Sequence, residues 1–202
     1  MFKEATQYLA TLDDDWAGLI EAVGPCRLKP HPEREPYAAL VRAVTFQQLH
    51  GRAAEAILNR LLELGNGHIP EPDELLALDF DSLRACGFSA RKIETLRGVA
   101  GAVQSGQVPT RRQAKRLDDE ALIQRLISLK GIGRWTVEML LIFTLERRDI
   151  LPVDDLGVRD GYRRLKRLET PLTPARLRQV GSAWSPYRSV ATWYLWQVPK
   201  AA

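Results

Sequence analysis

The sequence of 202 residues contains 45% hydrophobic and 27% charged side chains and has a formal net charge of +4. This length fits one compact domain or two small lobes, and the composition excludes intrinsic disorder and fibrous structure. The apolar run at 139–145 stops far short of the ~20 residues that a membrane span needs, so we expect no membrane association. The segment Met1 to Glu4 lacks the basic and long apolar regions of a signal peptide, which favours a cytoplasmic protein.

Charge is distributed unevenly along the chain. Residues 1–80 carry 7 Lys or Arg and 13 Asp or Glu, whereas residues 81–202 carry 22 and 12. A polyanion is the natural partner of the basic second part, although a solvated face of mixed charge fits the same counts. The two cysteines, Cys26 and Cys86, are too few for a four-cysteine zinc site or an iron–sulfur cluster, and we expect no metal centre.

Apolar residues recur with the period of an α-helix along almost the whole chain, and no comparable run alternates as a strand does. The sequence therefore predicts an all-α protein. In chain order the apolar stripes are Tyr37, Leu40, Val41 and Val44; Ala54, Ile57, Leu58, Leu61 and Leu62; Ile93, Leu96, Ala100 and Val103; Leu122, Leu126 and Leu129; and Val137, Leu140, Leu141 and Thr144.

Breaks rich in proline and glycine indicate how these helices are grouped. The segment 25–36 is typical of a connector, and a second junction lies near 147–153. We therefore expect a central helical bundle over 37–146 and a second helical lobe formed by 1–36 together with 147–202. Two such lobes would have a cleft between them.

The most informative segment lies between two apolar-periodic helices, where two glycines flank one isoleucine. Such a turn exposes backbone N–H groups, and the positive end of the following helix faces the same place, so it can hold a phosphate. The alternative is a plain packing corner between two helices. The predicted phosphate-binding residues are Lys130, Gly131, Ile132, Gly133, Arg134 and Thr136.

Five segments, taken together and in this order, resemble the helix-hairpin-helix DNA glycosylase superfamily, and the last resembles the 3-methyladenine DNA glycosylase II branch. The resemblance implies two helical lobes with a DNA-binding cleft, and hydrolysis of the N-glycosidic bond of alkylated bases in base excision repair. The segments are Phe46–Ala54, Gly87–Lys92, Leu129–Thr136, Leu151–Val158 and Trp184–Ser189.

Breaking an N-glycosidic bond builds positive charge on the sugar, which a nearby carboxylate stabilises, and the same group can orient the attacking water. The spacing from Pro152 selects Asp154 as the catalytic residue, by analogy with the family. Asp155 is then the N-cap of the next helix. The alternative is that both aspartates only cap that helix.

The hairpin position that carries a nucleophilic lysine in strand-cleaving relatives is Trp135 here. The resemblance therefore implies a monofunctional enzyme that uses water and leaves the strand intact. Lys130 precedes the hairpin glycines and is expected near phosphate. The absence of cluster cysteines also separates the chain from the endonuclease III and adenine-mismatch branches.

A base must leave the duplex before it reacts, and the resulting gap must be filled. The resemblance assigns Gln47, Gln48 and His50 to a wedge in the minor groove. It assigns Trp135, Met139 and Trp196 to a base pocket, in which aromatic rings attract an electron-poor or cationic base. Trp193 is expected in the core.

The predicted partner is double-stranded DNA that contains damaged bases, bound by a monomer associated with the nucleoid. No cofactor is required, although a monovalent cation could be held by backbone carbonyls of the hairpin. Two other functions remain open: a non-catalytic helix-hairpin-helix module that binds DNA, and a glycosylase for oxidised or mismatched bases. The sequence does not rank alkylated, etheno and deaminated bases.

Overall fold

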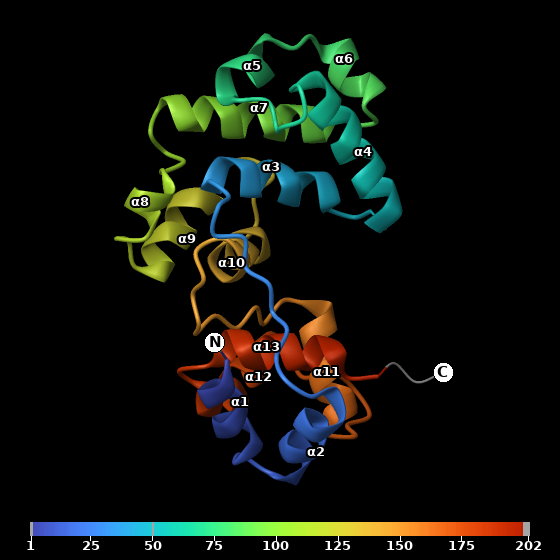
Figure 1. Cartoon of the computed structure of the whole chain (residues 1–202), viewed down its shortest axis with the longest axis vertical. Helices are drawn as coiled ribbons and strands as arrows, with labels where there is room; N and C mark the ends of the chain where they lie inside the picture. The colour runs from blue at the N-terminus through green and yellow to red at the C-terminus, as the bar shows by residue number, and fades with distance from the viewer. Residues whose placement is uncertain (1, 50, 200–202) are drawn as a thin grey trace. The chain divides into compact units, whose positions relative to one another are not determined.

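The computed structural model describes residues 2–49 and 51–199, and all regular structure in these ranges is helical (Figure 1). The all-α prediction is confirmed. Within these ranges no helix is long and apolar enough to cross a membrane. The chain separates into two compact units, which we call unit 1 (Met1–Pro30 with Glu146–Ala202) and unit 2 (His31–Leu145).

Residues 31–36 therefore belong with the central bundle, whereas the sequence interpretation began that bundle at residue 37. A tertiary contact ties this segment to the bundle: the backbone N–H of His31 donates to the carbonyl of Phe143 at 2.6 Å. The helices of unit 2 are α3 (Pro36–Phe46), α4 (Gly51–Leu64), α5 (Pro72–Ala77), α6 (Phe80–Ala85), α7 (Ala90–Gln104), α8 (Arg111–Ala114), α9 (Asp119–Ile127) and α10 (Arg134–Phe143).

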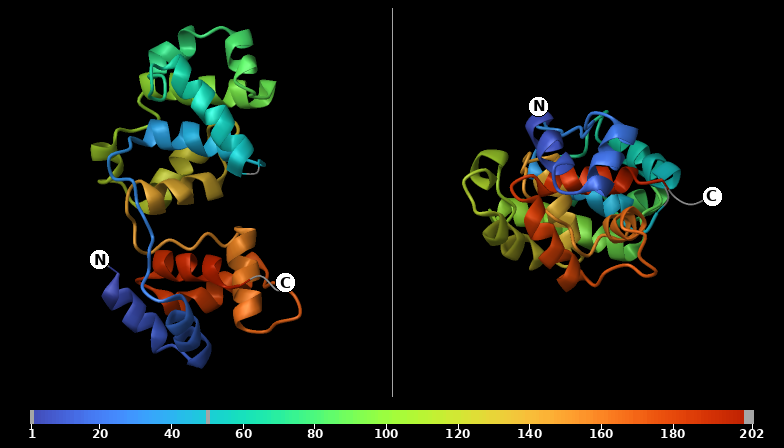
Figure 2. Two further views of the ribbon diagram at one scale, coloured as in Figure 1. Left: turned by 45° about the vertical axis from the view of Figure 1, so that its right-hand side comes forward. Right: turned by 90° about the horizontal axis from the view of Figure 1, so that it is seen from below.

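Helix α3 is the centre of unit 2. It contacts α4, α7 and α10, and it lies between α7 and α10 in Figures 1 and 2. Its predicted apolar stripe is buried on these neighbours, as are those of the helices around it, and burial of such stripes holds the bundle together. Fully or almost fully buried residues include Leu40, Val41, Val44, Leu61, Leu96, Leu122, Leu126, Val137 and Leu141.

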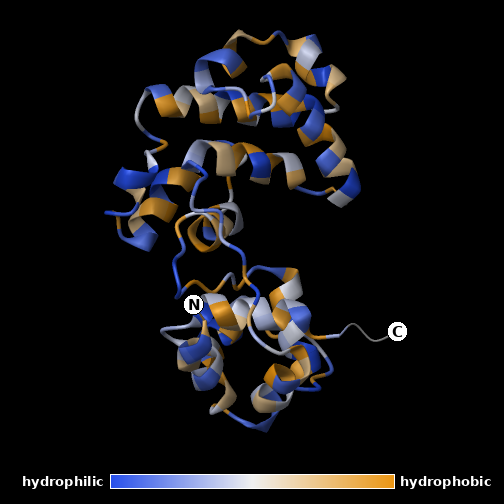
Figure 3. Cartoon of the chain, viewed as in Figure 1, coloured by the Kyte–Doolittle hydropathy of each residue, from blue (hydrophilic) through white to orange (hydrophobic). Residues whose placement is uncertain are grey.

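Unit 1 brings the two ends of the chain together around one core. Trp16 and Trp184 meet edge to face with ring centroids 5.3 Å apart, and the hydroxyl of Tyr194 donates to the carbonyl of Gly24 at 2.9 Å. Figure 3 shows hydrophobic and hydrophilic residues interleaved along these helices, as expected for short amphipathic elements. The elements are α1 (Lys3–Ala10), α2 (Asp14–Val23), α11 (Leu156–Leu165), α12 (Pro174–Val180), the 3₁₀ helix η1 (Gly181–Trp184) and α13 (Arg188–Gln197).

Candidate functional site

The predicted hairpin is present in unit 2, where α9 and α10 pack on each other and Gly133 is the N-cap of α10. The backbone N–H of Ile132 donates to the carbonyl of Leu129 at 3.0 Å, which closes the turn. The Ile132 side chain is buried, so this residue offers a ligand only its backbone. Thr136 is also buried, in the first turn of α10.

The two glycines of the hairpin have different roles. Gly131 has a φ of +85°, and a Cβ there would lie 2.2 Å from Oγ1 of Thr95. It is therefore required for the fold, as the packing-corner alternative expects. Gly133 has a φ of −93°, and a Cβ there would meet nothing within 4 Å. Its backbone is accessible, and no unusual dihedral explains the glycine.

The charged residues of the hairpin are paired with carboxylates. Nζ of Lys130 lies 2.6 Å from Oε1 of Glu94, and both side chains are exposed, so this pair is weak. Arg134 donates to both carboxylate oxygens of Glu120, at 2.9 and 2.6 Å, and to Glu138 at 3.1 Å. Hydrogen bonding to Glu120 raises the pKa of Arg134 further above its usual value. Arg134 braces α9 against α10, a structural role that the prediction of a phosphate contact did not include.

The three predicted wedge residues follow the end of α3. Nε2 of Gln47 donates to the carbonyl of Gly131 at 3.1 Å and to Oγ1 of Thr136 at 3.4 Å, so this side chain holds the hairpin instead of projecting from the loop. Gln48 is exposed and has a left-handed backbone, with a φ of 56°. His50 lies outside the described residues. Gln48 is therefore the described residue best placed to act as a wedge.

The two candidate aspartates directly precede α11 in unit 1 and differ in their surroundings. Asp154 is exposed and lies in a turn. Asp155 is half-buried, and its Oδ1 accepts hydrogen bonds from the backbone N–H of Val158 at 2.8 Å and from Nε1 of Trp196 at 3.1 Å. The prediction that Asp155 caps α11 is confirmed. A Cβ at Gly157 would lie 3.0 Å from Oδ1 of Asp155 and 3.1 Å from Cδ1 of Trp196, so this glycine gives the two side chains room to meet.

The loop that leads to these aspartates is tied to the beginning of α13. Arg188 donates from Nε and Nη2 to the two oxygens of Asp149, at 2.7 and 2.9 Å. Burial raises the pKa of Asp149, but hydrogen bonds from Arg188 and Ser185 outweigh it, so the pKa lies below its ordinary value. The Ser189 hydroxyl donates to the carbonyl of Arg147 and accepts from the N–H of Ile150. The Trp184–Ser189 motif therefore holds the aspartate loop, a role that the motif alone did not reveal.

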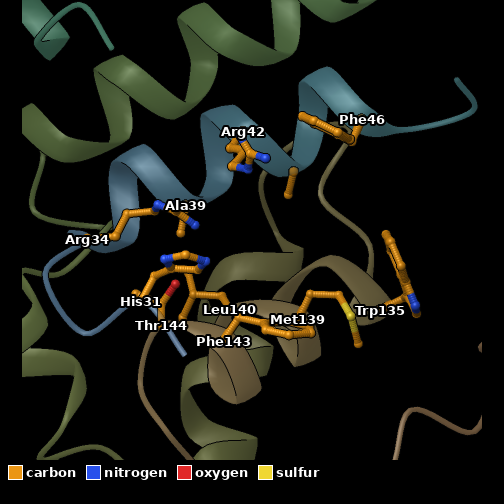
Figure 4. A pocket seen from close by; sticks show the side chains of 11 residues that line it. His31, Arg34, Ala39, Arg42, Phe46, Trp135, Met139, Leu140, Phe143 and Thr144 are labelled. Atoms are coloured by element: carbon orange, nitrogen blue, oxygen red, sulfur yellow. The ribbon is translucent and has the colours of Figure 1, made fainter. Parts of the chain in front are cut away.

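A cavity of about 300 Å³ opens in unit 2 between residues of α3 and α10 (Figure 4). Trp135, which is 38% exposed, and Met139 lie at one end of the labelled lining, as the base-pocket prediction requires. Trp196 belongs to unit 1, beside Asp155, so its place in a pocket with Trp135 stays a prediction. A second hollow, in unit 1, is lined by Leu156, Gly157, Arg159, Asp160, Arg164, Pro171 and Trp196.

The sequence analysis predicted none of the other lining residues of the unit 2 cavity as site residues. Its lining includes His31, Arg34 and Arg42 but no carboxylate side chain. The guanidinium of Arg42 lies 4.6 Å from the ring centroid of Phe46, and burial, followed by repulsion from Arg42, lowers the pKa of Arg34. The cation–π expectation therefore describes only the Trp135 end, because the other end offers hydrogen-bond donors and positive charge. In the described ranges, this cavity included, no group of three His, Cys, Asp or Glu side chains is placed to hold a metal ion.

Comparison with known sequences identifies the family. The profile of the "HhH-GPD superfamily base excision DNA repair protein" matches residues 41–186, a range that begins in α3 and ends just before α13. The chain belongs to the HhH-GPD superfamily. The matched range contains the hairpin, the wedge loop and both aspartates, whereas Arg188 and Trp196 lie just beyond it.

Individual relatives extend the similarity over the whole chain. DNA-3-methyladenine glycosylase 1 of Schizosaccharomyces pombe is 48% identical over 201 residues, which cover 98% of this chain and 88% of that protein. The solved S. pombe 3-methyladenine DNA glycosylase in complex with abasic DNA superposes with a TM-score of 0.90, covering 96% of each chain. A DNA-3-methyladenine glycosidase from Bacillus halodurans, 34% identical, gives a TM-score of 0.84 over 96% of this chain and 88% of its own.

Proposed function

We propose that this HhH-GPD protein is a monofunctional DNA glycosylase that flips alkylated bases of the 3-methyladenine type out of duplex DNA and hydrolyses their N-glycosidic bond. The main support is the similarity of this chain to a 3-methyladenine DNA glycosylase in complex with abasic DNA, with a TM-score of 0.90 and 48% sequence identity. Abasic DNA is the product that such hydrolysis leaves. The accessible Gly133 backbone at the N-terminus of α10 supplies the phosphate anchor.

The catalytic carboxylate comes from the pair Asp154 and Asp155. Spacing from Pro152 predicted Asp154, and we propose Asp155 instead because its side chain is the better held of the two. A carboxylate that stabilises charge at the sugar works best when its orientation is set before the reaction. Two hydrogen bonds set the orientation of Asp155 Oδ1, whereas Asp154 lies exposed in a turn. Capping and catalysis are compatible roles, because both need a carboxylate group whose orientation is fixed.

Water, not an amine, completes the reaction. Trp135 occupies the hairpin position at which strand-cleaving relatives carry a lysine, and it lines the unit 2 cavity. Nζ of Lys130, the nearest lysine along the chain, pairs with Glu94. Asp155 therefore orients or deprotonates water for attack on the sugar, the base leaves, and the product is an abasic site in an intact strand.

The partner is double-stranded DNA that carries damaged bases, bound by one copy of the chain where the cell holds its DNA. No cofactor is required for hydrolysis. A monovalent cation at the hairpin carbonyls remains a proposal, and Gln47 already donates to one of these carbonyls, that of Gly131. Phosphate binding by the N–H groups of the hairpin does not depend on such an ion.

Excision from a panel of single-lesion duplexes tests the proposal. We expect the wild-type chain to release alkylated purines, Asp155→Asn to abolish release while duplex affinity stays nearly constant, and Asp154→Asn to cost much less. The opposite ranking would restore Asp154. Duplex binding without release of any base would favour the non-catalytic module, and release confined to oxidised or mismatched bases would favour another branch of the superfamily.

A further inference from the structure

The start of α7 contacts both of the loops that the proposed reaction uses. Ser89 caps this helix, and Lys92 and Thr95 lie three residues apart in its first turns, a spacing that places them on one face. Lys92 extends towards the end of α3, and Thr95 meets the hairpin. None of the functions assigned above uses Lys92.

Lys92 holds the carbonyls at the end of α3. Its Nζ donates to the carbonyl of Thr45 at 2.8 Å and to the carbonyl of Gln47 at 2.9 Å. The last carbonyls of a helix have no partner within that helix, and a cation is favourable at this end of the helix dipole. Partial burial of the ammonium group lowers the pKa of Lys92.

The carbonyl of Gln47 has a particular importance because it belongs to the peptide group that joins Gln47 to Gln48. A peptide group is planar, so a hydrogen bond that fixes its oxygen also fixes the N–H of the next residue. Gln48 follows with a φ of 56°, a conformation that residues with a Cβ adopt infrequently. Lys92 therefore helps to set the direction in which the exposed Gln48 leaves the chain.

The same cluster reaches the hairpin by two routes. Oγ1 of Thr95 occupies the space beside Gly131, 2.2 Å from where a Cβ of that glycine would lie. The side chain of Gln47 donates to the carbonyl of Gly131 at 3.1 Å. The wedge loop, the hairpin and the start of α7 thus form one connected set of contacts, all within unit 2.

We infer that Lys92 is a positioning residue for base extrusion, which fixes the peptide group before Gln48 so that this side chain enters the duplex in a set orientation. The inference rests on the proposed glycosylase function. Through Gln47 and Thr95, the orientation of the wedge is linked to the hairpin that holds the phosphate. A wedge that is ordered in advance loses less conformational entropy when it fills the space of the extruded base.

The test compares Lys92→Met with Lys92→Arg, and uses Arg91→Met, an exposed neighbour on α7, as the control. Single-turnover excision of one lesion is measured in a stable base pair and opposite a mismatch. We expect Lys92→Met to slow excision from the stable pair about tenfold but from the mismatch by about twofold or less, because the mismatch has already lost part of its pairing energy. The ratio of the excision rate from the stable pair to that from the mismatch should stay at its wild-type value in the conservative variant Lys92→Arg and in the control.

A double variant shows whether Lys92 acts through the wedge. If it does, adding Gln48→Ala to Lys92→Met should reduce the ratio no further, since residues that act as one unit are not additive. Additive losses, or equal losses on both duplexes, would overturn the inference and leave Lys92 as a helix cap.

Two further results keep the inference separate from the proposed function. Circular dichroism and the unfolding midpoint identify loss of fold. If Lys92→Met does not fold, Lys92→Gln carries the same comparison of ratios. A wild-type chain that excises no base from any duplex contradicts the proposed function itself, and the inference about Lys92 with it.

Discussion

Arg188 binds both carboxylate oxygens of Asp149, and its backbone N–H adds a third hydrogen bond, to Oδ1 at 3.2 Å. Asp149 lies a few residues before the turn that carries Asp154 and Asp155. The pair therefore joins the start of α13 to the loop that supplies the proposed catalytic group. Such a bidentate contact restricts the loop more than a single ion pair would.

Arg188→Met should lower the free energy of unfolding by about 2 kcal/mol at pH 7, the usual effect of losing hydrogen bonds to a charged group. Excision should slow as well, because the aspartate loop loses its fixed position. Urea unfolding and single-turnover kinetics measure the two effects. The control is Arg178→Met, which removes a basic side chain from α12. Full activity of a folded Arg188→Met protein would show that the loop keeps its shape without the contact.

The same pair predicts a pH dependence. The folded pKa of Asp149 lies below its ordinary value of 3.8, so the folded state favours the ionised form. The stabilisation is therefore present above the ordinary value and is lost as the pH falls through the folded pKa. We expect the difference in unfolding free energy between wild type and Arg188→Met to shrink below about pH 4. A difference that stays constant from pH 7 to pH 3 would contradict this.

The two hairpin glycines should respond in opposite ways to alanine. Gly131→Ala should destabilise the fold by about 1–2 kcal/mol from its left-handed backbone alone, and by more from the contact with Thr95. Gly133→Ala should change the free energy of unfolding by less than about 1 kcal/mol. It should weaken binding to duplexes with and without a lesion by similar factors, because phosphate binding reads no sequence. Thermal unfolding and duplex titrations check both. Unchanged duplex affinity of folded Gly133→Ala would assign the hairpin to packing alone.

Borohydride should trap no covalent complex between the enzyme and a lesion duplex, because Trp135 offers no amine to form a Schiff base. The product should be an abasic site in an uncut strand. Denaturing electrophoresis before and after alkaline treatment reads both outcomes. Efficient trapping in the wild type that disappears in Lys130→Ala would assign Lys130 a nucleophilic role.

Trp196→Phe should slow excision about tenfold, which corresponds to losing one hydrogen bond to a charged group. The indole N–H at 3.1 Å helps to hold Oδ1 of Asp155, and phenylalanine keeps the apolar ring but lacks the donor. Duplex affinity should change little. Trp193→Phe, which alters a neighbouring indole packed edge to face on Tyr194, is the matched control. Equal effects of both substitutions would show a packing role for Trp196.

The arginines of the unit 2 cavity should influence the choice of base. If the flipped base enters this cavity, Arg34→Met removes one positive charge near it and should favour a cationic base over a neutral one by about threefold, the effect of one charge at roughly 6 Å in a water-like medium. Competition between 3-methyladenine and hypoxanthine duplexes measures this ratio. Arg112→Met, on the short helix α8, is the control for net charge. An unchanged ratio would place the base elsewhere.

The sequence by itself determined the local features of this protein. The helical period of the apolar residues, the two-glycine turn between α9 and α10 and the N-cap at Asp155 depend on neighbours a few residues away. Such interactions are readable from spacing, because backbone geometry alone brings these groups together. The motifs of the HhH-GPD superfamily were visible for the same reason.

Tertiary structure decided which partners each side chain of the site contacts. Asp149 meets Arg188 across 39 residues, Lys92 reaches Gln47 across 45, and Gln47 reaches Gly131 across 84. No spacing rule predicts such partners, because they depend on how whole helices pack. Packing also separated Gly131, which Thr95 crowds, from Gly133, which stays accessible. It also fixed Oδ1 of Asp155 through an indole from another helix, and this contact is the basis for proposing Asp155 where the motif spacing had selected Asp154.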